Sequence, residues 1–191
     1  AISRRQSESM ALVGLFAALI AVMGLIPKID LPLGVPITLQ TLGVMMAGCL
    51  LGPRRGLQAI ALFMIAVAAG LPLLAGGRGG LGVFMSPTAG YFVGFAPAAF
   101  ATGLLMAVLP KATPLRAAGS AFIASAVGGV LVLHGFGIAG LVLVAKIPFA
   151  QAFWGDLLFV PGDLLKCVLT ALVVHTVAKA LPDWRFGGRG A

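Results

Sequence analysis

The chain has 191 residues and an apolar composition, with 60% hydrophobic and only 9% charged residues. Soluble domains carry roughly 25% charged residues, so this composition, with a mean hydropathy of +1.11, excludes a soluble globular enzyme. A bilayer span needs about 20 apolar residues. The length therefore predicts a single all-α integral membrane domain over 1–191, with about six transmembrane helices joined by short loops.

The expected spans are apolar segments separated by prolines, glycines and charged turns. They cover approximately residues 10–26, 37–51, 56–71, 88–109, 117–144 and 162–181. The first ends at Pro27, and two prolines in 31–36 predict an extended connection to the second. Glycines at 128, 129, 135, 137 and 140 interrupt the fifth segment, so we expect this helix to be bent or broken near its end.

The net charge of +8 is concentrated on one side of this arrangement. Nine of the thirteen lysines and arginines fall on the side of the two termini: Arg4, Arg5, Arg54, Arg55, Lys111, Arg116, Lys179, Arg185 and Arg189. The other side receives Lys28, Arg78 and Lys146. Cytoplasmic loops are enriched in lysine and arginine, so both termini are expected in the cytoplasm, with the chain in the cell inner (cytoplasmic) membrane. This distribution explains the charge without a nucleic-acid partner.

The remaining cation, Lys166, lies inside the last span together with Asp163. Ionisable groups within a span cost about 2.5–3.5 kcal/mol each at its centre and usually mark a site or pathway. A spacing of three places both on one helix face, near the expected outer end of the helix. They are candidates for binding a polar ligand head, and a purely structural ion pair is the alternative.

A glycine-rich segment follows the third span and contains Gly76, Gly77, Gly79 and Gly80 around Arg78. Gly77, Gly79 and Gly82 match the dinucleotide-binding spacing, but that motif requires a soluble βαβ unit. No phosphate-binding loop is present either, so the chain is not expected to hydrolyse ATP. The segment is a candidate lid over a ligand cavity near the outer face, or a merely flexible outer loop.

Other polar residues are weaker candidates. Tyr91 opens the fourth span beside the glycine segment, and Gln40 opens the second, where Thr38 and Thr41 are also possible ligand contacts or helix caps. Asp156 is interpreted as a rim charge. His134 and His175 belong to different helices and have no partners at metal-ligand spacing, so we predict neither a metal site nor serine–histidine catalysis.

Two pairs of small residues in the first span have the spacing of close helix contacts, Gly14 with Ala18 and Ala17 with Ala21. Small residues let another helix approach closely, so that dispersion contacts hold the helices together. The spacing does not decide whether that helix belongs to this chain or to a partner.

Four stretches in this order resemble the BioY family, the biotin-specific substrate-binding component of energy-coupling factor (ECF) vitamin importers. They are Val35-Pro36-Ile37-Thr38-Leu39-Gln40-Thr41-Leu42, the segment from Gly70-Leu71-Pro72 to Gly80, Ser86-Pro87-Thr88-Ala89-Gly90-Tyr91, and Pro161-Gly162-Asp163-Leu164-Leu165-Lys166. Ser86 and Ala89 stand where the family more often has glycine, and neither change removes a polar contact.

The resemblance implies six helices and one biotin in a cavity on the outer side, with no cofactor. Asp163 and Lys166 would contact the polar head of biotin, Tyr91 and the loop 76–80 would line or cover the cavity, and Gln40 is a secondary contact. The small-residue face of the first helix would contact a transmembrane coupling subunit that carries two cytoplasmic ATPases, and ATP would be used only by these partners. An uncoupled facilitator and an intramembrane enzyme are the alternatives.

Overall fold

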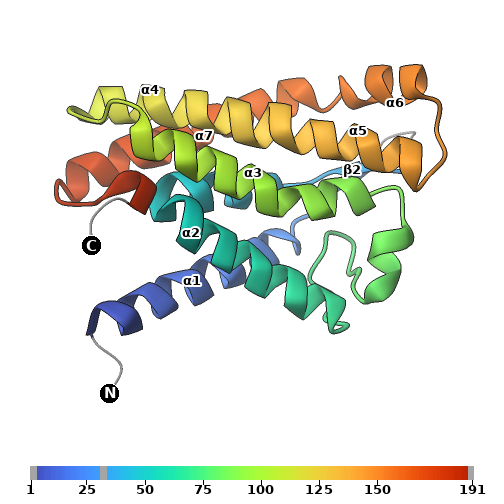
Figure 1. Cartoon of the computed structure of the whole chain (residues 1–191), viewed down its shortest axis with the longest axis horizontal. Coiled ribbons are helices and arrows are strands. Elements are labelled where there is room, and N and C mark those ends of the chain that lie inside the picture. Colours follow the sequence, from blue (N-terminus) through green and yellow to red (C-terminus); the bar gives the residue numbers. More distant parts are fainter. Residues whose placement is uncertain (1–3, 31–33, 189–191) are drawn as a thin grey trace.

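The computed structural model describes residues 4–30 and 34–188, and these form a bundle of long helices (Figure 1). The helices are α1 (Arg4–Met23), α2 (Gln40–Ala68), α3 (Ala89–Val108), α4 (Pro114–Ser125), α5 (Leu133–Leu143), α6 (Phe149–Asp156) and α7 (Val160–Ala180), with a π-helix η2 (Ala126–Val132) between α4 and α5. Among the described residues, five helical stretches are long and apolar enough to cross a membrane: Gln6–Met23, Gln40–Ala68, Ala89–Val108, Pro114–Leu143 and Val160–Ala180. The chain is thus a mostly helical, multi-pass membrane protein.

Helix α2 is divided by a sharp kink at Gly52, whose φ of 83° and ψ of 179° are not helical. Pro53 then starts the second arm, at a position where its missing N–H breaks no helical hydrogen bond. A Cβ on Gly56 would lie 3.1 Å from the carbonyl oxygen of Ala47, although nine residues of straight helix would separate them by about 13 Å. The kink therefore brings the start of the second arm against the end of the first. The two arms cover the apolar segments 37–51 and 56–71 that the sequence separates.

The expected bend near the end of the fifth span is wrong in its position, because the helix stays regular to Leu143 and the irregular part is η2 in the middle. Two glycines of this stretch, Gly128 and Gly140, allow close helix packing. A Cβ on Gly128 would lie 2.6 Å from the carbonyl oxygen of Ala98, and one on Gly140 would lie 2.4 Å from Cα of Gly90. Both glycines let the α4–α5 stretch approach α3 closely.

The connections at one end of the bundle contain most of the non-helical structure. β1 (Ile29–Asp30) and β2 (Pro36–Ile37) pair antiparallel, so the connection between α1 and α2 is extended, as the prolines predict. Between α2 and α3 lies a loop with a short 3₁₀ helix, η1 (Leu81–Met85). Helix α6 was not expected from the sequence, which predicted only a connection there.

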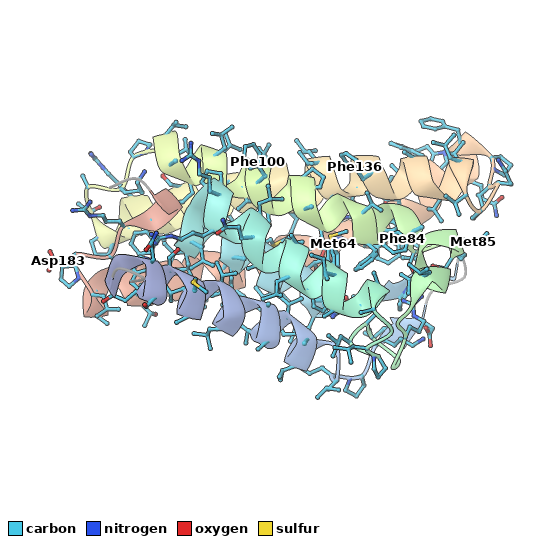
Figure 2. All side chains as sticks on the ribbon, turned by 60° about the horizontal axis from the view of Figure 1, so that its bottom comes forward. Met64, Phe84, Met85, Phe100, Phe136 and Asp183 are labelled. Carbon is cyan, nitrogen blue, oxygen red and sulfur yellow. The ribbon has the colours of Figure 1, made fainter. Side chains whose placement is uncertain are left out.

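The opposite end of the bundle holds the beginning of α1, the kink of α2 and the last 3₁₀ turn, η3 (Phe186–Gly188) (Figure 1). The cations at 54, 55, 111, 116, 179 and 185 lie next to the kink of α2, around the connection from α3 to α4 and around the end of α7, which is the grouping expected from the sequence. Arg189 lies outside the described residues, as do the side chains of Arg4 and Arg5. Apolar side chains such as Phe100 and Phe136 point outward between the two ends (Figure 2).

Candidate functional site

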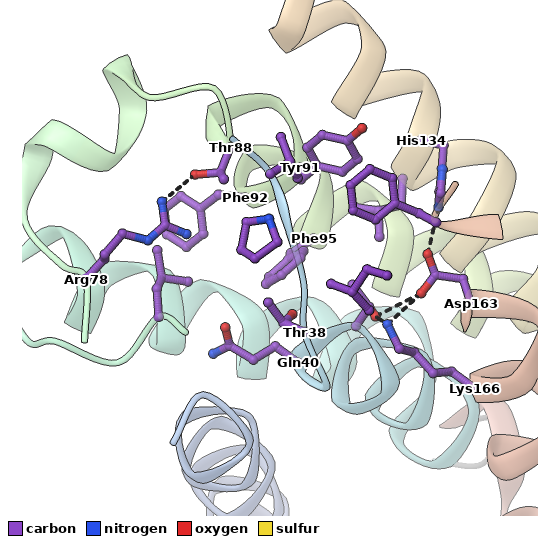
Figure 3. A pocket seen from close by; sticks show the side chains of 17 residues that line it. Thr38, Gln40, Arg78, Thr88, Tyr91, Phe92, Phe95, His134, Asp163 and Lys166 are labelled. Carbon is purple, nitrogen blue, oxygen red and sulfur yellow. Dashed lines mark hydrogen bonds and ion pairs between the residues drawn. The ribbon is translucent and has the colours of Figure 1, made fainter. Parts of the chain in front are cut away.

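A cavity lies at the end of the bundle that carries the β1–β2 pair and η1. It has about 570 Å³ of empty space, counting its open mouth. Its lining consists of Val35, Pro36, Ile37, Thr38, Gln40, Thr41, Leu74, Arg78, Thr88, Tyr91, Phe92, Phe95, Leu133, His134, Phe159, Asp163 and Lys166. The walls are mostly apolar, and the charged groups are gathered at two separate places (Figure 3).

The first polar group of the cavity is the pair on α7. Asp163 and Lys166 are only 4% and 7% exposed, and Lys166 Nζ donates to Asp163 Oδ1 at 2.7 Å. Lys166 Nζ also donates to Thr41 Oγ1 at 2.7 Å, which joins α7 to α2. The first turn of α7 places the carboxylate near the helix N-terminus, where the helix dipole favours it. An ammonium group has three donors, so one remains for a ligand in the cavity.

This pair belongs to a longer buried network that the sequence interpretation missed. His134 Nε2 lies 2.9 Å from Asp163 Oδ2, and His134 Nδ1 lies 2.7 Å from Asp156 Oδ2. Tyr91 donates its hydroxyl proton to Asp156 Oδ1. Asp156 is therefore a buried partner and not a rim charge, and Tyr91 presents its ring to the cavity while its hydroxyl is already bonded.

The contacts of this network indicate that its positive and negative charges are equal in number. Each ring nitrogen of His134 faces a carboxylate oxygen, so two protons must lie in these two contacts. With a protonated ring, the two cations His134 and Lys166 balance the two aspartates. Burying four ionisable groups is tolerated only when each finds such a partner. The signal available in the sequence was His134 itself, an ionisable residue inside an apolar span.

The second polar group of the cavity is Arg78 on the loop between α2 and α3. Its Nε donates to the carbonyl of Ala75 at 3.3 Å, and its Nη1 donates to Thr88 Oγ1 at 3.0 Å. No carboxylate pairs with Arg78 within the described part of the chain. Figure 3 shows the guanidinium across the cavity from Asp163 and Lys166, with Phe92 and Phe95 between the two groups.

The glycines of the loop do not line the cavity, although Leu74 and Arg78 do. Gly76, Gly77 and Gly80 have positive φ angles of 81°, 70° and 81°, a region that glycine enters without steric cost. Gly79 packs so tightly that a Cβ would lie 2.2 Å from the carbonyl oxygen of Leu71. The glycines thus shape a compact turn that directs Leu74 and Arg78 into the cavity.

Gln40 lines the cavity but is committed to other parts of the chain. Its Nε2 donates to the carbonyls of Ile20 at 3.1 Å and Leu73 at 3.0 Å, and its Oε1 accepts from the N–H of Ala75 at 3.2 Å. The amide is 1% exposed, and it ties the end of α1 and the glycine loop to the start of α2. Its observed contacts are structural.

The small residues of α1 lie on two faces. Ala17 is buried and Ala21 packs against the same core, whereas Ala18 is exposed and nothing lies within 4 Å of a Cβ built on Gly14. Only the Gly14–Ala18 face is open, and the Ala17–Ala21 face is an internal contact. Among the described residues, no group of three or more His, Cys, Asp or Glu is arranged to hold a metal ion.

Comparison with known proteins agrees with this architecture. The family model described as the BioY family matches residues 2–183. The chain is 46% identical over 185 residues to a biotin transporter BioY of Rhodobacter capsulatus, which covers 92% of this chain and 96% of that one. It is 46% identical over 179 residues to a biotin transporter BioY of Rhizobium etli, with the same coverage of 92% and 96%.

A solved structure shares the fold. The S-component for biotin from an ECF-type ABC transporter superposes with a TM-score of 0.82 at 30% identity, covering 94% of this chain and 95% of that chain. The match extends over the cavity end and the opposite end of the bundle alike. The resemblance in four sequence stretches is therefore confirmed over nearly the whole length, and this chain belongs to the BioY family.

Proposed function

We propose that this chain is the biotin-binding membrane subunit of an ECF-type importer, which captures biotin from the outside for ATP-driven uptake by partner subunits. The observation that carries this is the cavity with two polar groups on opposite walls, in a chain of the BioY family. Its relatives bear the names of transporters and not of enzymes. Biotin is the transported substrate in this proposal and no cofactor takes part.

The chemistry of the cavity suits biotin at both ends of the molecule. The ureido ring has N–H donors and a carbonyl acceptor, which match the carboxylate of Asp163 and the free donor of Lys166. The valerate carboxylate matches Arg78, the cation of the lining that has no carboxylate partner among the described residues. The aromatic side chains between them would contact the apolar ring and chain.

We propose six crossings, with α2 contributing two through its kinked arms, and both termini in the cytoplasm. The grouping of cations at the end of the bundle away from the cavity supports this orientation. It places the cavity near the outer face and the chain in the cell inner membrane. Substitution of single residues by cysteine tests it, because Cys49 and Cys167 are buried and give no labelling background. A membrane-impermeant thiol reagent applied to intact cells should label Ala145→Cys and spare Arg54→Cys.

The open face of α1, formed by Gly14 and Ala18, is proposed as the contact for a transmembrane coupling subunit that carries two ATPases. Its exposure and small side chains support a close helix contact. Replacing Ala18 by Leu should abolish copurification of the coupling subunit while biotin binding persists. Uptake that continues when the ATPases are deleted would identify an uncoupled facilitator instead.

Titration of the detergent-purified chain with biotin is the direct test of the binding function. An analogue without the ureido carbonyl leaves the buried partners of that group unpaired, so its affinity should fall by at least about 100-fold. Equal affinities for biotin and the analogue would refute the assignment of the ureido ring to Asp163 and Lys166. Absence of any biotin binding would refute the function itself.

A further inference from the structure

A second hollow lies at the end of the bundle away from the cavity, where α4 begins and α7 ends. It has about 1090 Å³ of space counting its open mouth. Its lining consists of Lys111, Ala112, Thr113, Pro114, Ala178, Lys179, Pro182, Trp184, Arg185 and Phe186. Three of these residues are cationic, and no acidic side chain of the described residues lines the hollow.

The three cations differ in how they are held. Lys111 Nζ donates to the carbonyls of Met106, Ala107 and Leu109, so its ammonium group closes the end of α3 and contributes charge to the hollow. Lys179 and Arg185 are exposed and have no hydrogen-bonded or ion-paired partner among the described residues. The first turn of α4 adds the positive end of a helix dipole at the same place.

A separate apolar groove lies beside this hollow on the outside of the bundle, between α4 and α7, and its lining begins at Leu115, next to Pro114 of the hollow. It is lined by Leu115, Ala118, Gly119 and Phe122 of α4 and by Val168, Ala171, Leu172 and His175 of α7. Its space is about 610 Å³. Residues 168, 171, 172, 175 and 179 follow one another at helical spacing of three or four, so groove and hollow share one face of α7.

The floor of the groove is made of small residues. A Cβ built on Gly119 has no neighbour within 4 Å, and Ala118 and Ala171 stand beside it in the lining. The rim is apolar and open to the surroundings, with Leu115 75% and Leu172 57% exposed. His175 lies between the apolar groove and the cationic hollow, one helical turn before Lys179.

We propose that this surface binds an anionic phospholipid, with the phosphate group in the hollow against Lys179 and Arg185 and an acyl chain in the groove. Two observations carry the assignment: the cationic hollow complements a phosphate group, and the apolar groove lies next to it on the same face of α7. A free phosphate would use only the hollow, and an acidic protein segment would have no need of an apolar groove within the bilayer.

The test is native mass spectrometry of the full chain with phosphatidylglycerol and with phosphatidylcholine of the same acyl chains. Phosphatidylglycerol should be retained at least about tenfold more strongly, because the hollow is lined by cationic and not by acidic side chains. The double substitution K179Q/R185Q should remove this preference. The matched control R54Q/R55Q removes two exposed cations from the same end of the bundle but outside the hollow, and it should keep the preference.

The substitution Gly119→Leu separates a lipid site from a phosphate site. The new side chain enters open space in the groove, so the helix tolerates it. Retention of phosphatidylglycerol should fall at least about fivefold. Inorganic phosphate should compete with the lipid no better than it does in the unchanged chain. Biotin affinity measured on every variant shows that the fold is intact and keeps this result separate from the transport function. Three results would each overturn the proposal. The first is equal retention of the two lipids, and the second is loss of the lipid preference in R54Q/R55Q. The third is unchanged retention of phosphatidylglycerol in Gly119→Leu together with its displacement by inorganic phosphate.

Discussion

The two polar walls of the cavity are built in different ways. On the helix side, Lys166, Asp163, His134 and Asp156 come from α5, α6 and α7 and bond to one another while almost fully buried. On the loop side, Arg78 stands alone on a turn shaped by glycines, with a threonine hydroxyl and a carbonyl as its described partners. The helix wall is preorganised and balanced in charge, whereas the loop wall presents one uncompensated cation.

This contrast indicates which wall should dominate affinity. A buried group whose partner is removed becomes an unpaired charge, which costs several kcal/mol. A half-buried cation such as Arg78, which keeps two hydrogen bonds of its own, loses less when a ligand contact is removed. The helix wall should therefore set affinity and recognition of the ring. The loop wall should contribute less and respond mainly to the carboxylate of the ligand.

The largest effect is expected from Lys166→Met. It removes the proposed ligand contact and leaves Asp163 without its ammonium partner, so biotin affinity should fall by about 100- to 1,000-fold, the equivalent of about 3–4 kcal/mol. Calorimetric titration measures the change. Lys146→Met removes an exposed lysine at the same end of the bundle and should leave affinity unchanged; a similar loss there would show that net charge and not the pair is responsible.

A smaller loss is expected from His134→Gln, which removes the bridge between Asp156 and Asp163. Two carboxylates then share the site with one cation, and affinity should fall by roughly 10- to 100-fold through displacement of Asp163. Tyr91→Phe deletes only the last bond of the network and should cost less than about fivefold. If the two variants lose affinity equally, His134 is not the residue that holds Asp163 in position for the ligand.

Arg78→Gln should weaken biotin binding by about tenfold, because one charge-assisted contact to a carboxylate is lost on a partly open wall. The sharper measurement uses a biotin analogue with an alcohol in place of the carboxylate. The substitution should change the affinity of this analogue by less than about twofold. A full tenfold loss with the analogue would place the carboxylate elsewhere.

The smallest effect is expected from Gly77→Ala in the loop. Its φ of 70° costs an L-residue about 1–2 kcal/mol, so the stability of the protein should fall slightly. The added Cβ meets no atom within 4 Å, so the affinity for biotin should stay within about threefold of the original value. Gly79→Ala is the contrasting variant, because its Cβ would collide with the carbonyl of Leu71 and displace the turn that carries Arg78. Thermal unfolding and titration of both variants distinguish a shaped turn from a merely flexible loop.

Much of the architecture could be predicted from local patterns. The boundaries of α3 and α7 agree with the apolar segments within about two residues, since prolines and charges mark helix ends in the sequence. The extended connection before α2 followed from its prolines. Helix α6 was missed because eight residues with aromatic side chains have no periodicity that separates them from a loop. The irregular part of the fifth segment was expected too close to its end, because glycines that break a helix and glycines that pack against one look alike in sequence.

The site was predicted only in part. Asp163 and Lys166 are separated by three residues on one helix, and a local spacing of this kind is visible in the sequence. The approach of His134 and Asp156 joins residues 22 positions apart, and that of His134 and Asp163 joins residues 29 apart. Such contacts depend on how α5, α6 and α7 come together in the folded bundle, which no local motif in the sequence specifies.

The sequence by itself determined that this chain resides in a membrane, that its cations gather at one end, and that one aspartate and one lysine share a helix face. These properties follow from composition and from spacing along a single helix. Only the tertiary structure decided that the pair continues into a charge-balanced network, that Gln40 ties the loop to the bundle, and that Arg78 faces the pair across the cavity. Contacts between helices depend on which faces meet, and that choice is made by the packing of the whole bundle.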